Sequence, residues 1–362
     1  FIDFEEIEKS GKADEFVNEL IEITKDQYIT EVDDNNQTVF HLVSKFSSLN
    51  DKNINLIFET INSLDLEYLI KYRTKNGRSI LMEFANSGNY KAIEYFTNKN
   101  LYSFYNRDIY GDNILHAILN SRNASNNKMF SCFCSIIKKC PELILQKNRD
   151  NESPFMIAAK KGFNGILALM TTIYPIKVLD SIKAPILHIA AQNNYPETIR
   201  YIVQNLHVNV NIKSEDGLTA LHIAAMTSSI HAYEELISLG GNPLITCREM
   251  TAIDYALEHG SEKMIEYVMK QPSFKYELST PKVIFHLAKN PEGYSSFVLA
   301  LTFFEESAIH LCDSKGMSLI SAACIKNNRK TVSDLLMLGC EPNKDNLNGQ
   351  NSIHMIQLDV LI

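Results

Sequence analysis

The amino-acid sequence predicts an all-α solenoid, in which short helix pairs stack on one another and hairpin tips join successive pairs. Three observations predict this fold. A phrase that usually consists of one capping residue and two apolar residues returns ten times along the 362 residues. His occupies the fourth place of the phrase in six of those ten copies. Gly or Asn returns nine positions after the capping residue in several copies, where a first helix should end.

The repeated phrase is clearest at 216–225, which reads DGLTALHIAA, and a close copy at 184–191 reads APILHIAA. Weaker copies follow in the same register. The ten phrases begin at Thr38, Ser79, Asn113, Ser153, Pro185, Thr219, Thr251, Val283, Ser318 and Asn351. The steps between these positions run from 32 to 41 residues, and most lie between 32 and 35. A step of about 33 residues is typical of one class of repeat protein.

These phrases resemble the T-P-L-H-x-A-A phrase of ankyrin repeats, and the resemblance covers essentially the whole chain. It is strong for 150–257, good for 315–356 and weak before residue 108. The resemblance implies a single array of about ten repeats over 1–362. We expect an atypical first helix pair at 1–32, divergent repeats at 33–149, the best-matching repeats at 150–270 and further repeats at 271–362, with the last one incomplete.

Within each repeat the expected order is a first helix, a turn, a second helix and a tip. Ser or Thr caps the first helix, and small pairs such as Ala224-Ala225 let two helices pack closely. The second helix ends at a Gly, as in 234–240 and 333–339. Turn-forming dipeptides mark the tips, for instance at 76–77, 110–111 and 216–217. The turn residues between the two helices are Gly88, Gly162, Asn194, Gly260 and Asn327.

The two longest steps, of 41 and 40 residues, carry extra polar stretches at 47–53 and 121–127. Both stretches are rich in Asn and Ser, and we expect loops there, between the two helices of a repeat and opposite the tips. Insertions that gather on one face of an array often mark a contact surface. Drift in a tolerant loop is the other interpretation.

Six His residues occupy the fourth place of the phrase: His41, His116, His188, His222, His286 and His354. Their spacing is the period of the fold and matches no spacing of metal ligands. The resemblance implies that this His forms a hydrogen bond with backbone between neighbouring repeats. The four remaining His residues, His207, His231, His259 and His310, show no metal spacing either.

The sequence predicts no metal, no cofactor and no catalytic residue. Cys132, Cys134 and Cys140 lie close together, but a zinc site needs a fourth ligand. The segment 129–137 is typical of an apolar second helix, which favours buried thiols. No nucleophile elbow, phosphate-binding loop, catalytic carboxylate pair or calcium loop occurs. We therefore predict that the chain is not an enzyme.

The surface remains as the candidate site. In ankyrin-like stacks the partner usually lies on the concave side, which consists of the tips and the first helices. The candidate contact residues here are Arg78, Tyr110, Asp112, Glu152, Lys183, Glu215, Met250 and Lys315. Their charges are mixed, so they predict no strong steering field. Tyr110 and Met250 are the preferred anchors, and a solvated tip with an incidental apolar residue is the alternative for each.

Composition limits the class of partner and the compartment. The formal net charge of −8 and the isoelectric point near 5.7 argue against a nucleic-acid partner. No apolar run reaches the ~18 residues of a membrane helix, so we predict no direct membrane insertion. Seven Cys without a dense framework favour reduced thiols and an intracellular, cytoplasmic or cytoskeletal location.

The function predicted from the sequence is a non-enzymatic scaffold for protein partners, within a larger complex such as a cytoskeletal or ciliary assembly. The alternative is an adaptor arm of an effector or of a membrane channel, with the active part elsewhere. The last phrase has only its first helix before Ile362, and half a repeat cannot bury its apolar face. We therefore expect more protein beyond residue 362.

Overall fold

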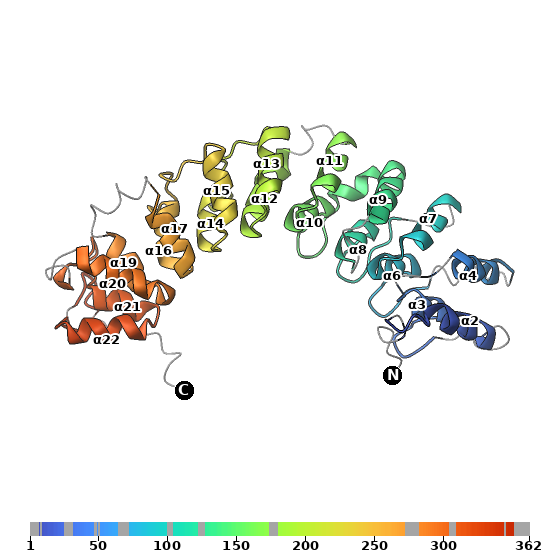
Figure 1. Cartoon of the computed structure of the whole chain (residues 1–362), viewed down its shortest axis with the longest axis horizontal. Coiled ribbons are helices and arrows are strands. Elements are labelled where there is room, and N and C mark those ends of the chain that lie inside the picture. Colours follow the sequence, from blue (N-terminus) through green and yellow to red (C-terminus); the bar gives the residue numbers. More distant parts are fainter. Residues whose placement is uncertain are drawn as a thin grey trace. The chain divides into compact units, whose positions relative to one another are not determined.

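The computed structural model of the chain consists of helices, and no strand occurs among the residues that it describes. This confirms the all-α class. The described residues are 7, 9–24, 32–46, 49, 51–63, 72–99, 104–121, 127–173, 180–271, 282–303, 309–343 and 345–350. They belong to two compact units, Phe1–Leu179 and Asp180–Ile362, which are described separately below (Figure 1). A continuous array through residue 179 stays a prediction.

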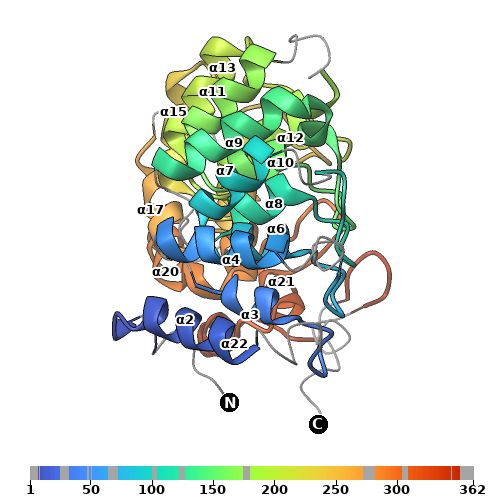
Figure 2. The ribbon, with the colours of Figure 1, turned by 90° about the vertical axis from the view of Figure 1, so that its right-hand side faces the viewer.

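The N-terminal unit, Phe1–Leu179, alternates first and second helices. An additional helix, α2 (Ala13–Thr24), packs against α3 and α4. The first helices are α3 (Val39–Val43), α6 (Ile80–Ser87), α8 (Ile114–Asn120) and α10 (Pro154–Lys160). The second helices are α4 (Asp51–Ser63), α7 (Tyr90–Lys99), α9 (Asn127–Lys139) and α11 (Asn164–Ile173), and the 3-10 helix η1 (Pro141–Leu145) follows α9. In Figure 2, α6, α8 and α10 lie between the loops and the second helices.

The C-terminal unit, Asp180–Ile362, repeats this order. Its first helices are α12 (Asp180–Gln192), α14 (Ala220–Met226), α16 (Ala252–His259), α19 (Lys282–Lys289) and α21 (Leu319–Ile325). Its second helices are α13 (Pro196–Asn205), α15 (Ile230–Ser238), α17 (Glu262–Met269), α20 (Tyr294–Phe303) and α22 (Arg329–Met337). The 3-10 helix η3 (Pro291–Gly293) precedes α20. First helices pack on first helices, such as α14 on α16, and second helices pack on second helices, such as α13 on α15.

The first helices begin where the sequence predicts. Oγ of Ser79 accepts a hydrogen bond from the backbone N–H of Met82 at 3.2 Å, and Ser153 does the same for Met156 at 3.3 Å. Such a side-chain cap satisfies one of the free N–H groups at a helix start. None of the helices that the structure describes combines the length and apolar character that a membrane span requires.

The turn after the first helix is left-handed at most of the predicted positions. Gly88 has φ 82°, and Asn194 and Asn327 have φ 58° and 53°. Gly260 differs from the prediction, because its φ is −73°. A Cβ at Gly260 would lie 2.4 Å from the carbonyl oxygen of Ala256, so close approach of the backbone excludes a larger residue there.

Buried Asn side chains join neighbouring repeats at the start of the second helix. Nδ2 of Asn328 donates to the carbonyls of Ala288 and Asn290, both at 3.0 Å. Nδ2 of Asn290 donates in turn to Leu257 and Gly260 of the repeat before, at 3.0 and 2.7 Å. These amides satisfy carbonyls at the ends of first helices, which would otherwise be buried without a partner.

The extra residues of the two longest steps lie partly in helices. Residues 51–53 belong to α4, which corrects the predicted loop at that place. Helices α4 and α9 have 13 residues each, whereas α7 and α11 have 10. Longer second helices therefore accommodate part of the additional length. Residues 47, 48, 50 and 122–126 lie outside the described part of the chain.

Overpacking at Ala224 tests the helix interface. Ala224 is fully buried in α14, which packs on α16. We expect Ala224→Leu to lower the free energy of unfolding by about 1–3 kcal/mol, because a close-packed interface has no room for the larger side chain. Thermal unfolding followed by circular dichroism measures the change. The control Met226→Leu alters a half-exposed residue of the same helix. Equal melting of the Ala224 variant and the parent would contradict the interface.

Candidate functional site

The tips that precede the capping residues share one turn. At 108–112, Oδ1 of Asp108 accepts hydrogen bonds from the N–H groups of Tyr110 and Asp112, both at 2.9 Å. The fourth tip residue, Gly111, has φ 78°. Four other tips begin with an equivalent acceptor, namely Asp33, Asn148, Asp313 and Asn346. A side chain that binds N–H groups two and four positions ahead fixes the tip from within.

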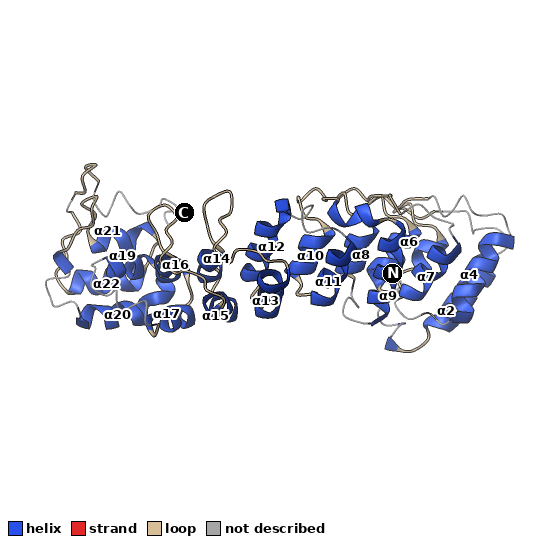
Figure 3. Cartoon of the chain, turned by 90° about the horizontal axis from the view of Figure 1, so that it is seen from above, coloured by secondary structure: helices blue, strands red, loops and turns tan. Residues whose placement is uncertain are grey.

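Neighbouring tips are also joined through their backbones. In the N-terminal unit the N–H of Ile109 donates to the carbonyl of Asn76 at 2.9 Å, and that of Arg149 donates to Tyr110 at 2.8 Å. In the C-terminal unit the N–H of Leu347 donates to Lys315 at 3.1 Å. The loops of the N-terminal unit consequently run side by side along α6, α8 and α10 (Figure 3). Among the described residues, the predicted hairpin tips contain isolated antiparallel bridges, such as Lys213 with Thr219, and no strand.

Most of the predicted contact residues lie on these tips. Tyr110 is 51% exposed, and Glu215 and Lys315 are exposed as well. Met250 is half-buried beside a tighter tip, whose residues Arg248 and Glu249 both have positive φ, 52° and 66°. The structure therefore presents Tyr110 to solvent more openly than Met250.

The other predicted contact residues are held by partners within the chain. Nε of Arg78 lies 3.2 Å from Oδ2 of Asp108, whose side chain is fully buried. Oδ1 of Asp112 accepts from Asn148 at 2.9 Å. Oε1 of Glu152 lies 2.8 Å from Nζ of Lys160. These three side chains stabilise the tips, and they are less free to meet a partner than Tyr110.

Lys183 was predicted to be near a tip, and the structure places it inside α12 (Asp180–Gln192). The segment 180–184 contains no Gly or Asn that could adopt the left-handed turn, whereas the tip before Thr219 has Gly217 at φ 82°. Asp180, with a carboxylate suited to a helix start, begins the helix, which continues through Pro185.

The His of the repeated phrase joins two repeats. Nδ1 of His222 accepts a hydrogen bond from the N–H of Thr219 at 3.1 Å and lies 2.7 Å from its hydroxyl oxygen. Nε2 lies 3.3 Å from the carbonyl oxygen of Met250, the residue before the next cap. A neutral ring with its proton on Nε2 satisfies both contacts. His116 has the same contacts to Asn113 and Glu152, and Nε2 of His188 reaches Leu218.

Burial favours the neutral form of three His rings of the phrase, His41, His116 and His222. Burial lowers the pKa values of His116 and His222, and it lowers the pKa of His41 to about 4. Nε2 of His41 lies near the Arg78 carbonyl, the equivalent position, but forms no hydrogen bond of normal geometry among the described residues. His354 lies outside the described residues.

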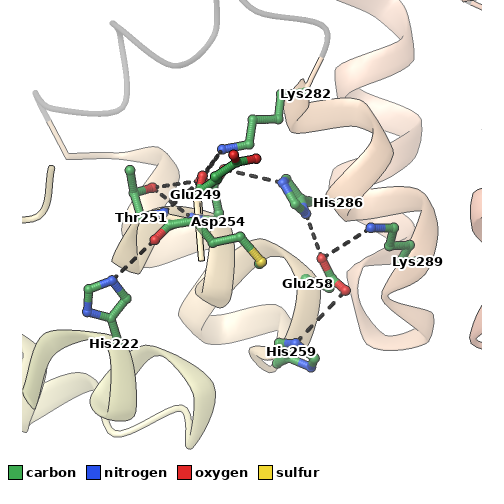
Figure 4. Close-up of polar contacts among 10 residues, drawn as sticks. His222, Glu249, Thr251, Asp254, Glu258, His259, Lys282, His286 and Lys289 are labelled. Atoms are coloured by element: carbon green, nitrogen blue, oxygen red, sulfur yellow. Dashed lines mark hydrogen bonds and ion pairs between the residues drawn. The ribbon is translucent and has the colours of Figure 1, made fainter. Parts of the chain in front are cut away.

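His286 does not make the backbone contact that the resemblance implies. Its Nδ1 lies 2.7 Å from Oε2 of Glu258, and its Nε2 lies 3.4 Å from Oδ1 of Asp254 (Figure 4). Both carboxylates belong to α16, the first helix of the preceding repeat. The reason lies in the sequence, because Asp254 occupies the fourth place of that repeat, where six of the ten copies have His. Oδ2 of Asp254 still caps its helix, by accepting from the N–H of Thr251 at 2.8 Å.

Two Lys residues of α19 complete this group, which we call the α16–α19 cluster: Asp254, Glu258, Lys282, His286 and Lys289 (Figure 4). Nζ of Lys282 lies 2.6 Å from Oδ2 of Asp254, and Nζ of Lys289 lies 3.4 Å from Oε2 of Glu258. Nδ1 of His286 forms a hydrogen bond with Glu258, whereas its Nε2 and Oδ1 of Asp254 form no hydrogen bond of normal geometry among the described residues.

The electrostatics of the α16–α19 cluster favour the ionised form of Glu258. Burial alone would raise the pKa of Glu258, but the hydrogen bond from His286 and the charge of Lys289 outweigh it and hold the pKa at about 2. His259 follows Glu258 at the helix end, and burial lowers its pKa. Among the described residues no three His, Cys, Asp or Glu side chains form a group that could hold a metal ion. The cluster is an ionic contact between two repeats.

The predicted buried thiols can be placed as well. Cys132 and Cys140 are buried, Cys134 is half-buried, and all three are free. Burial raises the pKa of Cys132 far above its usual range, so this thiol is unreactive.

Comparison with known families decides the fold family of the best-matching segment. The family model described as ankyrin repeats (3 copies) matches residues 187–278. Residues 187–278 of the chain are ankyrin repeats. The match includes α14, the tip before Thr251 and the carboxylates of the α16–α19 cluster. Ankyrin repeats generally mediate protein–protein interaction, and they are typically non-enzymatic modules.

A segment of the chain is also similar to a curated protein. Alpha-latrotoxin-Lhe1a of Latrodectus hesperus is 27% identical over 117 residues, which are 32% of this chain. The chain spans only 8% of the length of that relative. The similarity is therefore confined to a short segment of a much longer protein.

Two features of the repeats were not predicted from the sequence, the side-chain acceptor at the start of a tip and the α16–α19 cluster. The tip acceptor lies five positions before the cap, as Asp108 lies before Asn113 and Asp313 before Ser318, and this regular spacing could have revealed it. The sequence also contains an indication of the α16–α19 cluster. Asp254 stands at the fourth place of its phrase, where six copies have His, and His286 follows in the next repeat between Lys282 and Lys289.

Proposed function

We propose that the chain is a non-enzymatic scaffold that binds protein partners through the tips and first helices of its ankyrin repeats. The observation that carries the proposal is the hydrogen-bonded ladder of tips, which holds exposed side chains such as Tyr110 and Lys315 on a rigid frame. A rigid surface loses little conformational entropy when a partner binds. The contact residues proposed are Arg78, Tyr110, Asp112, Glu152, Lys183, Glu215, Met250 and Lys315, of which Lys183 lies within the first helix α12.

Tyr110 provides the direct test. We expect Tyr110→Ala to leave thermal unfolding unchanged, since half of the side chain is exposed, and to weaken a partner about tenfold or more. A photo-crosslinking residue at 110 should capture the partner from extracts of cells that express the chain. The same residue at Lys263, exposed on α17, is the matched control. Capture from 263 but not from 110 would contradict the proposal.

The proposal extends to a structural role within a large cytoskeletal or ciliary assembly. Co-sedimentation of the chain with such an assembly, and its loss on Tyr110→Ala, tests this extension. The alternative is an adaptor arm of an effector or of a membrane channel, which would use the same surface. The coding sequence on either side of residues 1–362 distinguishes the two.

A further inference from the structure

Two adjacent apolar side chains are exposed at one tip of the N-terminal unit. Ile109 is 41% exposed and Tyr110 is 51% exposed, at the second and third positions of the same turn. Their backbone is fixed on both sides, because Ile109 donates to Asn76 on the tip before and Tyr110 accepts from Arg149 on the tip after. A Cβ at Gly111 would lie 3.2 Å from the backbone nitrogen of Arg149, so the tips are in close contact.

Cationic side chains lie on both sides of this apolar pair. Lys75 precedes Asn76 on the tip before, and Arg149 is bonded to Tyr110 on the tip after; both are exposed. Arg107 is exposed as well, and its Nη1 donates to the carbonyl of Lys147 at 3.2 Å. We call these six residues the tip patch: Lys75, Arg107, Ile109, Tyr110, Lys147 and Arg149.

Most of the neighbouring carboxylates are already engaged. Asp108 pairs with Arg78, Asp112 accepts from Asn148, and Glu152 pairs with Lys160. The side chains of Lys75, Lys147 and Arg149 have no ion pair among the described residues. Three exposed carboxylates lie on tips at the edges of the patch, Asp33, Asp34 and Asp150, and Asp33 accepts hydrogen bonds from two backbone N–H groups of its own tip. The tip patch is thus locally cationic in a chain whose formal net charge is −8.

We propose that the tip patch binds an acidic protein segment, whose carboxylates face Lys75, Lys147 and Arg149 while an apolar side chain packs on Ile109 and Tyr110. This inference rests on the proposed function and names the chemistry of the partner. Tyr and Arg are enriched among the residues that carry binding energy at protein interfaces. Complementary charge increases the rate and the specificity of association.

A nucleic acid fits the tip patch less well. An unbroken row of phosphates would approach Asp34 and Asp150 at the edges, and Ile109 offers no ring for base stacking. An acidic peptide can place its carboxylates beside the cations alone, and its apolar side chain uses the centre of the patch. A single-stranded poly(dT) probe therefore serves as the competing ligand in the test.

The test selects binders from random dodecapeptides displayed on phage, with the full chain as bait, and measures the affinities of the selected peptides by fluorescence anisotropy. We expect peptides with Asp or Glu on both sides of an aromatic or aliphatic residue. Their affinity should fall at least about tenfold in Lys75→Glu/Arg149→Glu and in Tyr110→Ala. It should stay unchanged in Lys263→Glu, the matched charge reversal on α17.

Each other outcome counts against the tip patch. Neutral or basic peptides, peptides unaffected by the tip variants, poly(dT) binding tighter than every peptide, or a selection without binders would each overturn the inference. Selected peptides that lose affinity in Met250→Ala instead would leave the proposed function standing and refute only the tip patch. Circular dichroism of each variant is expected to show that the fold is retained, because the substituted side chains are exposed or half-buried.

Discussion

His286→Ala is expected to lower the free energy of unfolding by about 3 kcal/mol, because it removes a buried imidazole that forms a hydrogen bond with Glu258 and lies beside the buried carboxylate of Asp254. The side chain of Asp254 is fully buried, and that of Glu258 is 12% exposed. Each carboxylate keeps one Lys after the substitution, so we expect the lower end of the range for breaking a buried ion pair. His259 also lies near Glu258, with its Nε2 4.0 Å from Oε1, so Glu258 keeps this longer contact after the substitution (Figure 4).

Urea unfolding followed by circular dichroism measures this change, since the chain has no Trp for fluorescence. Amide hydrogen exchange locates it, with faster exchange expected in α16 and α19 than in α13. The control His207→Ala removes an exposed His of the same unit and should change the free energy by less than about 0.5 kcal/mol. Equal stability of the His286 variant and the parent would refute the ionic contact.

A double-mutant cycle separates the ionic contact from general packing. Glu258→Gln removes the carboxylate charge while keeping the size of the side chain. If His286 and Glu258 form a pair, the effects of the two substitutions should be non-additive by about 0.5–3 kcal/mol. Additive effects would mean that the two side chains stabilise the fold independently.

The sequence predicted the parts of the fold that depend on local chemistry. Capping at Ser79 and Ser153 and left-handed turns at Gly88 and Asn194 need only a suitable residue at a regular position. The backbone contact of His222 followed from resemblance to the family, and it requires only that two repeats adjoin. These features recur because each repeat contacts its neighbours in the same way.

The features that differ from the prediction depend on substitutions in a neighbouring repeat. His286 pairs with carboxylates because Asp254 replaces the usual His one repeat earlier, so the phrase of one repeat could not reveal its partner. Lys183 lies in a helix because its segment lacks a turn residue, and periodicity alone predicted a tip. The exposure of Ile109 beside Tyr110 likewise required the arrangement of three successive tips.

Acidification from pH 7 to pH 4 is expected to destabilise the chain through its buried His residues. Burial lowers the pKa of His41 from 6.5 to about 4, so between these values the unfolded chain binds a proton that the folded chain does not. Stability therefore falls as the pH drops below 6.5, and the loss from His41 reaches about 3 kcal/mol near pH 4. The pKa values of His116 and His222 are lowered too, so they act in the same direction.

His41→Gln isolates this contribution. Gln at the third helical position can still bond to the N–H of Thr38 and complete the capping box, but it does not titrate. Urea unfolding at pH 7, 6, 5 and 4 should show a smaller loss of stability in the variant, by up to about 3 kcal/mol at pH 4. The control His207→Gln makes the same substitution at an exposed His of the C-terminal unit.

Glu258 predicts a second, separate loss at lower pH. Its pKa is about 2 in the folded chain and 4.5 in the unfolded chain, so its contribution is complete above 4.5 and is lost as the pH falls towards 2. Glu258→Gln should therefore reduce the pH dependence below 4.5, whereas His41→Gln should reduce it between 6.5 and 4. The same pH dependence in both variants would refute the separate roles, because the two side chains lie in different units and titrate in different ranges.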